Sequence, residues 1–123
     1  MPDITSEPLQ DGGKRQVFIT GAVREPATGK GRYDLISVYA LHRIAIHYEK
    51  GASKYDDRNW EKGIPASRCI SSALRHTLQY LAGCNDEDHL AAACWNLMAI
   101  MHFEKTMPDM NDIATRQKAG DTC

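Results

Sequence analysis

Two short polar segments carry many of the residues in this sequence that could do chemistry. The first, 47–60, contains Glu49, and the second, 86–96, contains Glu87 and Asp88. Hard divalent cations such as Mg²⁺ prefer oxygen ligands and usually keep several waters while they bridge one or two carboxylates to phosphates. The three acids are therefore candidate ligands for a divalent cation. Solvated charges near a helix terminus would give the same pattern.

Two histidines accompany these acids. His76 lies between the two segments, and His89 lies within the second. An imidazole can bind a metal, transfer a proton or contact a phosphate. Each histidine taken alone could instead have a structural role, with its hydrogen bonds satisfied inside the fold. Several titratable groups near one place favour a site more than any single group does.

Cationic, aromatic and carboxamide side chains lie in and near the same segments. They could hold a phosphate chain and a base. A phosphate chain needs cationic partners because its charge is dense and directional. Aromatic rings can stack on a base or pack as a small satellite core, and carboxamides can hydrogen-bond to a ligand. Exposed surface charge is the alternative for the cations. The candidate substrate-binding residues are Lys54, Arg58, Asn59, Trp60, Arg75 and Asn96.

Three amphipathic segments must position these groups. Apolar residues recur at helical spacing, and the segments are bounded by capping residues, proline and glycine. The predicted helices run from Ser37 to Gly51, from Pro65 to Gly83, and from Asn85 or Asp86 to about Lys105. Their predicted buried stripes are Val38, Leu41, Ala45 and Tyr48; Ile70, Ala73, Leu74, Leu78 and Leu81; and Leu90, Ala93, Leu97, Ile100 and Met101.

Both ends of the chain differ in composition from this helical part. Residues 1–15 are polar and are predicted to be flexible, and Val17–Val23 could form a short strand or an extended arm. The helical pattern stops after Met107, so 108–123 is predicted to be a tail or a short helix. The sequence thus predicts one all-α domain over 16–107.

Charge and hydropathy exclude several classes of protein. With 15 basic and 16 acidic residues among 123, the chain has no broad basic surface for a nucleic acid polymer. Its longest apolar stretch, Leu97–Met101, is too short to span a membrane, and no secretory signal begins the sequence. The four cysteines show no metal or redox spacing and are interpreted as reduced. We therefore expect a soluble cytoplasmic protein.

The order of the motifs resembles that of the dATP/dGTP diphosphohydrolase family of tailed phages. The resemblance covers roughly residues 18–105. The segments that carry it are Gly29–Ile36, Glu49–Tyr55 with Arg58–Trp60, Arg75–His76 and Glu87–Asn96.

This resemblance implies an all-α relative of the MazG-like nucleoside triphosphate pyrophosphohydrolases. The implied fold is a bundle of three principal helices with an extended N-terminal arm, completed by oligomerisation into a homodimer or homotetramer. Better-known members hold Mg²⁺ or Mn²⁺ with an E-E-x-x-E motif on one helix and an E-x-x-D motif on the next. Neither motif is intact here: Glu49 stands alone, and Ala91 replaces the acid that a match starting at Asp88 would need.

The implied reaction is metal-dependent hydrolysis of purine deoxynucleoside triphosphates to the monophosphate and pyrophosphate. It would shape the nucleotide pool of a phage in its host cytoplasm. The implied metal ligands are Glu49, Glu87 and Asp88, and the implied catalytic residues are Glu49, Glu87, His76 and His89.

Two alternatives remain open at the level of sequence. A histidine-aspartate metal phosphohydrolase would also be helical, but it ordinarily has an adjacent His-Asp pair, and this chain has the reverse order at Asp88-His89. A non-catalytic helical module that binds nucleotides or assembles with a partner would also suit an acid-poor site.

Overall fold

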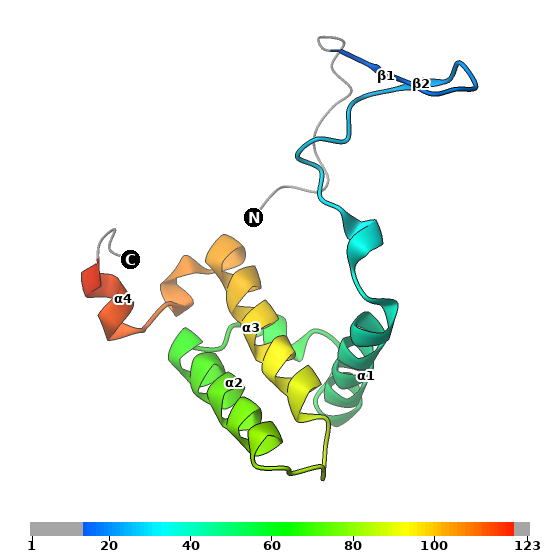
Figure 1. Cartoon of the computed structure of the whole chain (residues 1–123). Helices are drawn as coiled ribbons and strands as arrows, with labels where there is room; N and C mark the ends of the chain where they lie inside the picture. The colour runs from blue at the N-terminus through cyan, green and yellow to red at the C-terminus, as the bar shows by residue number, and fades with distance from the viewer. Residues whose placement is uncertain (1–13, 120–123) are drawn as a thin grey trace. The chain divides into compact units, whose positions relative to one another are not determined.

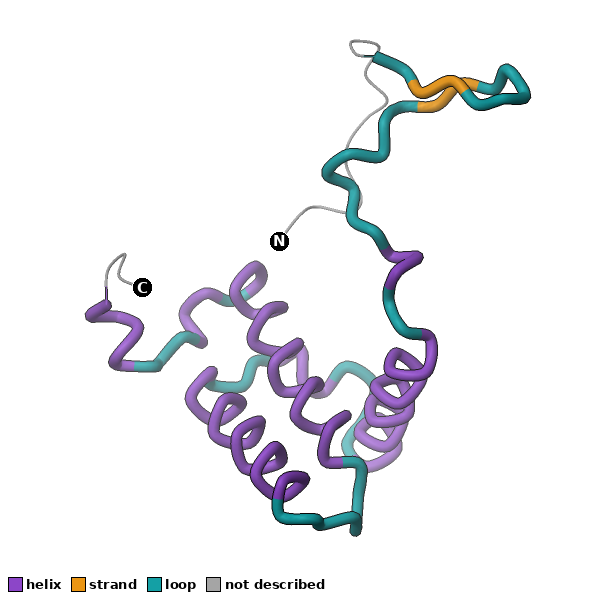
Figure 2. Tube along the Cα trace, in the orientation of Figure 1, coloured by secondary structure: helices purple, strands orange, loops and turns teal. Residues whose placement is uncertain are grey.

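The computed structural model describes residues 14–119, which fall into two units. The first is the N-terminal segment up to Ile36, and the second is the helical part from Ser37 onward (Figures 1 and 2). Most of the predicted flexible segment 1–15, and the last four residues of the predicted tail, lie outside the described residues.

The N-terminal unit contains a small hairpin. Strands β1 (Gln16–Val17) and β2 (Val23–Arg24) pair antiparallel, with Val17 opposite Val23. The chain reverses at Gly21, whose φ of 89° suits glycine because a side chain rarely adopts it. The single extended segment predicted over 17–23 is therefore two very short strands joined by a turn. A 3₁₀ turn at Tyr33–Leu35 follows.

The second unit is all-α, as predicted, with three principal helices. These are α1 (Val38–Lys54), α2 (Ala66–Leu81) and α3 (His89–Thr106), followed by the short α4 (Ala114–Ala119). Short 3₁₀ turns lie at Asn59–Lys62 and Pro108–Met110. None of the described helices combines the length and apolar character needed to cross a membrane.

The helix ends follow local capping chemistry, with two departures from the prediction. Ser37 caps α1 as predicted, because its hydroxyl accepts a hydrogen bond from the Ala40 amide. Helix α1 does not stop at Gly51 but continues to Lys54. Helix α3 is capped by Asp88 rather than by Asn85 or Asp86, since the Asp88 carboxylate accepts a hydrogen bond from the Ala91 amide.

Helix α2 ends at the predicted glycine in a well-defined motif. Gly83 has a φ of 88°, a left-handed conformation that glycine adopts without strain. The Cys84 amide donates to the Gln79 carbonyl, and the Gly83 amide donates to the Tyr80 carbonyl. These two bonds satisfy carbonyls that the end of a helix would otherwise leave unpaired.

The first turn of α2 is capped from far along the chain. Its N-cap, Pro65, offers no side-chain hydrogen bond. Instead, Asp112 accepts hydrogen bonds from both the amide (2.8 Å) and the hydroxyl (2.6 Å) of Ser67. The hydrogen bond with the Ser67 side chain lowers the pKa of Asp112 below its usual range. The segment after α3 is thereby attached to the start of α2.

Helix α3 is the central element, because it packs against both α2 and α1. Small residues line its contact with α2, and Ala92 and Ala99 are almost completely buried there together with Cys69. Phe103 closes this core near the C-terminal end of α3. Small side chains let the two helix backbones approach closely.

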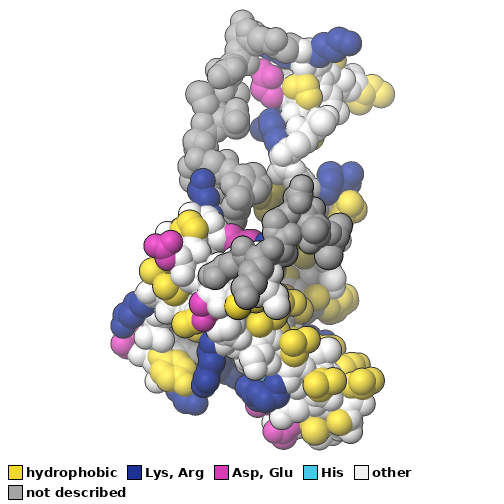
Figure 3. All heavy atoms as spheres, turned by 90° about the vertical axis from the view of Figure 1, so that its left-hand side faces the viewer, with side chains coloured by type: hydrophobic (Ala, Val, Ile, Leu, Met, Phe, Trp, Pro, Cys, Tyr) yellow, Lys and Arg dark blue, Asp and Glu magenta, His cyan; other side chains and the backbone are white. Residues whose placement is uncertain are grey.

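The predicted apolar stripes are largely not the faces that the helices bury. Leu74, Leu78 and Leu97 remain 59%, 62% and 43% exposed, and no residue of α1 is buried. The physical reason is that the close seam between α2 and α3 accepts small residues, so the larger apolar side chains point elsewhere. In Figure 3, hydrophobic side chains gather low on the right of the face shown.

Candidate metal and nucleotide site

The helical unit contains a pocket of about 930 Å³. The C-terminal half of α1 lines it, together with the following segment 55–61. Residues of α2 and α3 and Glu87, which lies between these helices, complete the wall. The pocket is large enough for a small-molecule ligand.

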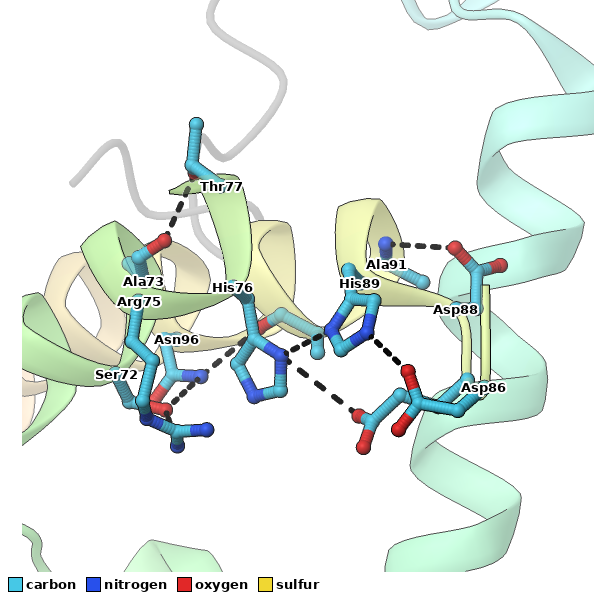
Figure 4. A network of polar contacts seen from close by, with 12 residues as sticks. Ser72, Ala73, Arg75, His76, Thr77, Asp86, Asp88, His89, Ala91 and Asn96 are labelled. Carbon is cyan, nitrogen blue, oxygen red and sulfur yellow. Dashed lines mark hydrogen bonds and ion pairs between the residues drawn. The ribbon is translucent and has the colours of Figure 1, made fainter. Parts of the chain in front are cut away.

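Two buried histidines meet where α2 and α3 pack (Figure 4). His76 of α2 and His89 of α3 are 8% and 2% exposed, and their Nδ1 atoms lie 2.9 Å apart. The Glu87 carboxylate is 3.7 Å from Nδ1 of His76. On the far side of the pair, Asp86 lies 2.8 Å from Nε2 of His89. A chain of four polar groups therefore runs between the helices.

The contact with Asp86 sets the protonation pattern of the pair. A carboxylate can only accept, so Nε2 of His89 donates to Asp86, and the hydrogen bond lowers the pKa of Asp86. In a neutral His89 the other nitrogen, Nδ1, then carries a lone pair and accepts a hydrogen bond from His76. Burial lowers the pKa of His76, which favours its neutral form.

His76, Glu87 and His89 form a group that could hold a metal ion. One ligand atom from each residue lies within 4.8 Å of the others. In a metal-bound histidine, the N–H of the second ring nitrogen usually donates to a carboxylate. The Nε2–H of His89 donates to Asp86 in this way. Both implied catalytic histidines and one implied metal ligand are thus brought together.

Asp88 lies outside this group. Its two carboxylate oxygens accept hydrogen bonds from Arg43 of α1 at 2.8 and 2.7 Å. These bonds, with the bond to the Ala91 amide, lower the pKa of Asp88 to about 2. Asp88 therefore links α1 to α3 and caps α3.

Glu49 is exposed on α1 and is not among the residues that line the pocket. Its neighbours His47, Tyr48 and Lys50 do line the pocket. The structure thus places Glu49 and Glu87 in different surroundings, although the sequence predicted both as metal ligands.

The predicted phosphate-binding residues all line the pocket: Lys54, Arg58 and Arg75. Arg75 donates to the Ser72 hydroxyl at 3.3 Å. Arg58 contacts Glu61 at 2.6 Å and has a left-handed backbone with a φ of 60°. Such a conformation in a residue other than glycine carries strain and is found more often at functional sites.

Aromatic and carboxamide groups form another part of the lining. The Trp60 ring lies 5.9 Å from Tyr48 and 6.3 Å from Trp95, measured between centroids. Asn59 and Asn96 also line the pocket. The Asn96 amide nitrogen donates to the Ala92 carbonyl and the Ser72 hydroxyl, so this polar residue in an apolar helix has partners, as the sequence requires.

Several lining residues were not predicted from the sequence. His47 and Lys50 lie one helical turn apart and share the face of α1 that Lys54 occupies, so their spacing with Lys54 is the signal that could have found them. Burial lowers the pKa of His47, with Glu87 opposing the shift. Asp86 does not line the pocket, but its role was also missed; it precedes His89 by three residues, a spacing that permits their local contact.

The fold and the pocket define a small all-α domain with a candidate metal group beside cationic and aromatic side chains. The chain matches the family described as dATP/dGTP diphosphohydrolase, N-terminal, over residues 20–113, and it belongs to this family. The match contains every residue of the predicted site. The family description names a hydrolase that acts on nucleotides. No curated protein and no solved structure matches the chain.

Proposed function

We propose that this protein hydrolyses dATP and dGTP to the corresponding monophosphate and pyrophosphate in a metal-dependent reaction. One water is consumed: its oxygen bonds to the α-phosphorus as the bond from this phosphorus to the bridging oxygen breaks. Family membership supports the substrate class. The observation that carries the proposal is that the His76, Glu87 and His89 group adjoins a pocket lined by cations.

The family resemblance implies Mg²⁺ or Mn²⁺, and Glu87 with His76 and His89 would hold the cation. These residues fit a divalent cation because three ligand atoms converge and Asp86 orients one imidazole. When bound, the ion would neutralise charge on the phosphates and lower the pKa of an attacking water. Glu87 lines the pocket, and its second carboxylate oxygen could take a proton from a water there.

The phosphates would be held by Arg75, Lys54 and Arg58. Arg75 lies one residue from His76 and lines the same pocket, so it suits the charge that develops on the leaving pyrophosphate. Arg58 is paired with Glu61, and it would exchange this partner for a phosphate.

The base and sugar would occupy the part of the pocket near Trp60, Asn59 and Asn96. Asn96 lies seven residues after His89 on α3, a separation of about 10 Å along the helix. The base would therefore lie farther along α3 than the reacting phosphate. Trp60 could then stack on a purine ring.

The roles of Glu49 and Asp88 as metal ligands stay predictions from the family resemblance. Asp88 would have to leave Arg43 to bind a cation, and Glu49 would need a route to the pocket from its exposed position. Self-association into a homodimer or homotetramer and a cytoplasmic location are proposed with the function.

Product analysis with all eight nucleoside triphosphates, with and without divalent cations, tests the proposal. We expect pyrophosphate and monophosphate from dATP and dGTP only when the cation is present. Orthophosphate as the sole phosphate product would instead indicate phosphatase chemistry of the histidine-aspartate kind. Nucleotide binding without any product would support the second candidate, a non-catalytic binding module, which the position of Asp88 and Glu49 outside the metal group favours.

A further inference from the structure

We propose that His76, Glu87 and His89 bind a divalent cation of intermediate softness, such as Mn²⁺, Co²⁺ or Zn²⁺, in preference to Mg²⁺. The proposal deepens the proposed function, and any catalytic role of the cation rests on that function. Binding itself rests on the ligand atoms and their geometry. This preference would decide between Mg²⁺ and Mn²⁺, a choice that the family resemblance leaves open.

The chemical types of the three ligand atoms determine which cation the site prefers. Two of the three ligand atoms are imidazole nitrogens, and only Glu87 supplies oxygen. Imidazole suits transition metals and zinc, whereas Mg²⁺ demands near-octahedral oxygen coordination and gives up its waters reluctantly. Replacing water around Mg²⁺ by two imidazoles would gain little, so this site should discriminate against it.

The positions of the ligand atoms are close to those that a metal needs. Bonds of about 2.0–2.1 Å at a tetrahedral angle hold two nitrogen ligands about 3.3–3.4 Å apart. Nδ1 of His76 and Nδ1 of His89 are 2.9 Å apart, so they need to separate by only a few tenths of an ångström. The Glu87 oxygen, at 3.7 Å from His76 Nδ1, is also near ligand spacing.

His89 is already oriented for binding, and His76 needs only a change of tautomer. Asp86 accepts the Nε2 proton of His89, which leaves Nδ1 of a neutral His89 free of a proton and available as a ligand. His76 can carry its proton on Nε2 instead of Nδ1, and Figure 4 shows this nitrogen pointing away from His89. The neutral pair can therefore present both Nδ1 atoms to a metal without net loss of a proton.

The site would be closed on one side and open on the other. His89 is only 2% exposed, whereas His76 and Glu87 line the pocket. Three protein ligands leave at least one coordination position for water or a phosphate oxygen, as in catalytic metal sites. An ion held here would therefore be accessible to a ligand in the pocket.

A spectroscopic titration of the full, tag-free chain with Co²⁺ tests the proposal, because Co²⁺ bound to nitrogen ligands absorbs visible light. We expect one equivalent to bind, and we expect Zn²⁺ or Mn²⁺ to displace it. A hundredfold excess of Mg²⁺ should leave the spectrum unchanged. Displacement by Mg²⁺ at concentrations similar to those of Mn²⁺, or no Co²⁺ binding, would overturn the proposal.

Three variants locate the site. Glu87→Gln removes a ligand from a half-exposed side chain, so the fold should survive, and Co²⁺ affinity should fall at least tenfold. Asp86→Asn should weaken binding about 10–100-fold by removing the carboxylate that orients His89. His42→Gln changes an exposed histidine of α1 and should leave binding unaltered.

Equal Co²⁺ affinity in Glu87→Gln, Asp86→Asn and the original protein would place the cation elsewhere and refute the assignment. Thermal melting with and without Zn²⁺ provides a readout independent of the spectrum, since an ion that binds only the folded state raises the melting temperature. Selective metal binding without nucleotide hydrolysis would overturn the proposed function and leave this inference standing. If Mg²⁺ supported hydrolysis as well in Glu87→Gln as in the original protein, this inference would be overturned and the proposed hydrolysis would stand.

Discussion

The inner seam between α2 and α3 and the outer faces of the helices are built from different residues. The inner seam buries small side chains such as Ala92 and Ala99, together with the polar residues His76, His89 and Asn96. The outer faces of α1 and α2 expose large apolar side chains, including Leu41, Leu78 and Leu81. Polar chemistry is thus inside, and much of the larger apolar surface is outside.

This difference shows that the buried polar part of the site lies in the seam. Burying a polar group is costly unless it finds a partner, and the seam supplies partners for both histidines and for Asn96. An exposed apolar patch of several large residues marks an interaction surface in a soluble protein. The outer faces therefore suit the self-association that we propose.

The strongest loss of activity should come from changing Glu87, the half-exposed acid beside the inner seam. Glu87→Gln should lower kcat/KM for dATP by at least 100-fold, because a metal ligand and its charge are removed while the side-chain size is kept. Steady-state kinetics at saturating metal would measure the loss, and circular dichroism would check the fold. Near-normal turnover would show that the metal group beside the seam does not take part in the reaction.

Glu49→Gln tests whether chemistry is confined to the seam. The family motif predicts that this change also lowers activity by orders of magnitude, although Glu49 is exposed on α1. The matched assay uses the same kinetics as for Glu87→Gln. Unchanged turnover would confine the acids of the site to those beside the inner seam, whereas a large loss would show that α1 contributes from its exposed side.

A charge on the outer face should disrupt assembly without unfolding the chain. Leu78 is 62% exposed on α2, so Leu78→Lys should leave helicity intact and shift an oligomer to smaller species by electrostatic repulsion and lost apolar contact. Light scattering at micromolar concentration measures the shift. A monomeric original protein would contradict the proposed role of the outer faces.

Overpacking distinguishes the two regions by stability. Ala92→Leu inserts a large side chain where the original is 1% exposed, and it should lower the free energy of unfolding by about 1–3 kcal/mol. Ala45→Leu, at an exposed position of α1, is the matched control and should change it by no more than about 0.5 kcal/mol. Urea titration compares them, and equal effects would refute the contrast.

The weakest response should be a pH dependence of stability that arises at the link between α1 and α3. Because Arg43 lowers the pKa of Asp88 to about 2, the folded state holds this carboxylate ionised more strongly than the unfolded state does. Its contribution is present above the ordinary aspartate pKa and is lost as pH falls toward 2. Asp88→Asn should flatten this part of the stability curve, as measured by urea titration between pH 5 and pH 2.

Local chemistry made much of the fold predictable. The Ser37 cap, the Pro65 start, the Gly83 stop and the end of the third helix near Lys105 are set by neighbouring residues, and the structure contains them. The all-α class follows from the same periodicity. Gly51 misled the prediction because a glycine within a helix costs only about 1 kcal/mol relative to alanine, which surrounding turns can overcome.

The buried faces were less predictable, because periodicity reveals an apolar stripe but not the surface that covers it. Leu74 and Leu78 form such a stripe and remain exposed, while His76 on another face is buried. The pairing of His76 with His89 depends on tertiary packing over 13 residues of sequence, which spacing within a helix cannot reveal. For the same reason, the engagement of Asp88 with Arg43 was not foreseen.

The hydrogen bonds from Ser67 to Asp112 make the stability of α2 depend on residues beyond the three principal helices. A fragment ending at residue 107 would keep all three principal helices but lose the carboxylate that caps α2. Unpaired amides would then fray the first turn of α2, next to the core residue Cys69. The short C-terminal segment thus holds the start of α2 in place, and we expect a fragment that ends before Asp112 to unfold less cooperatively than one that includes it.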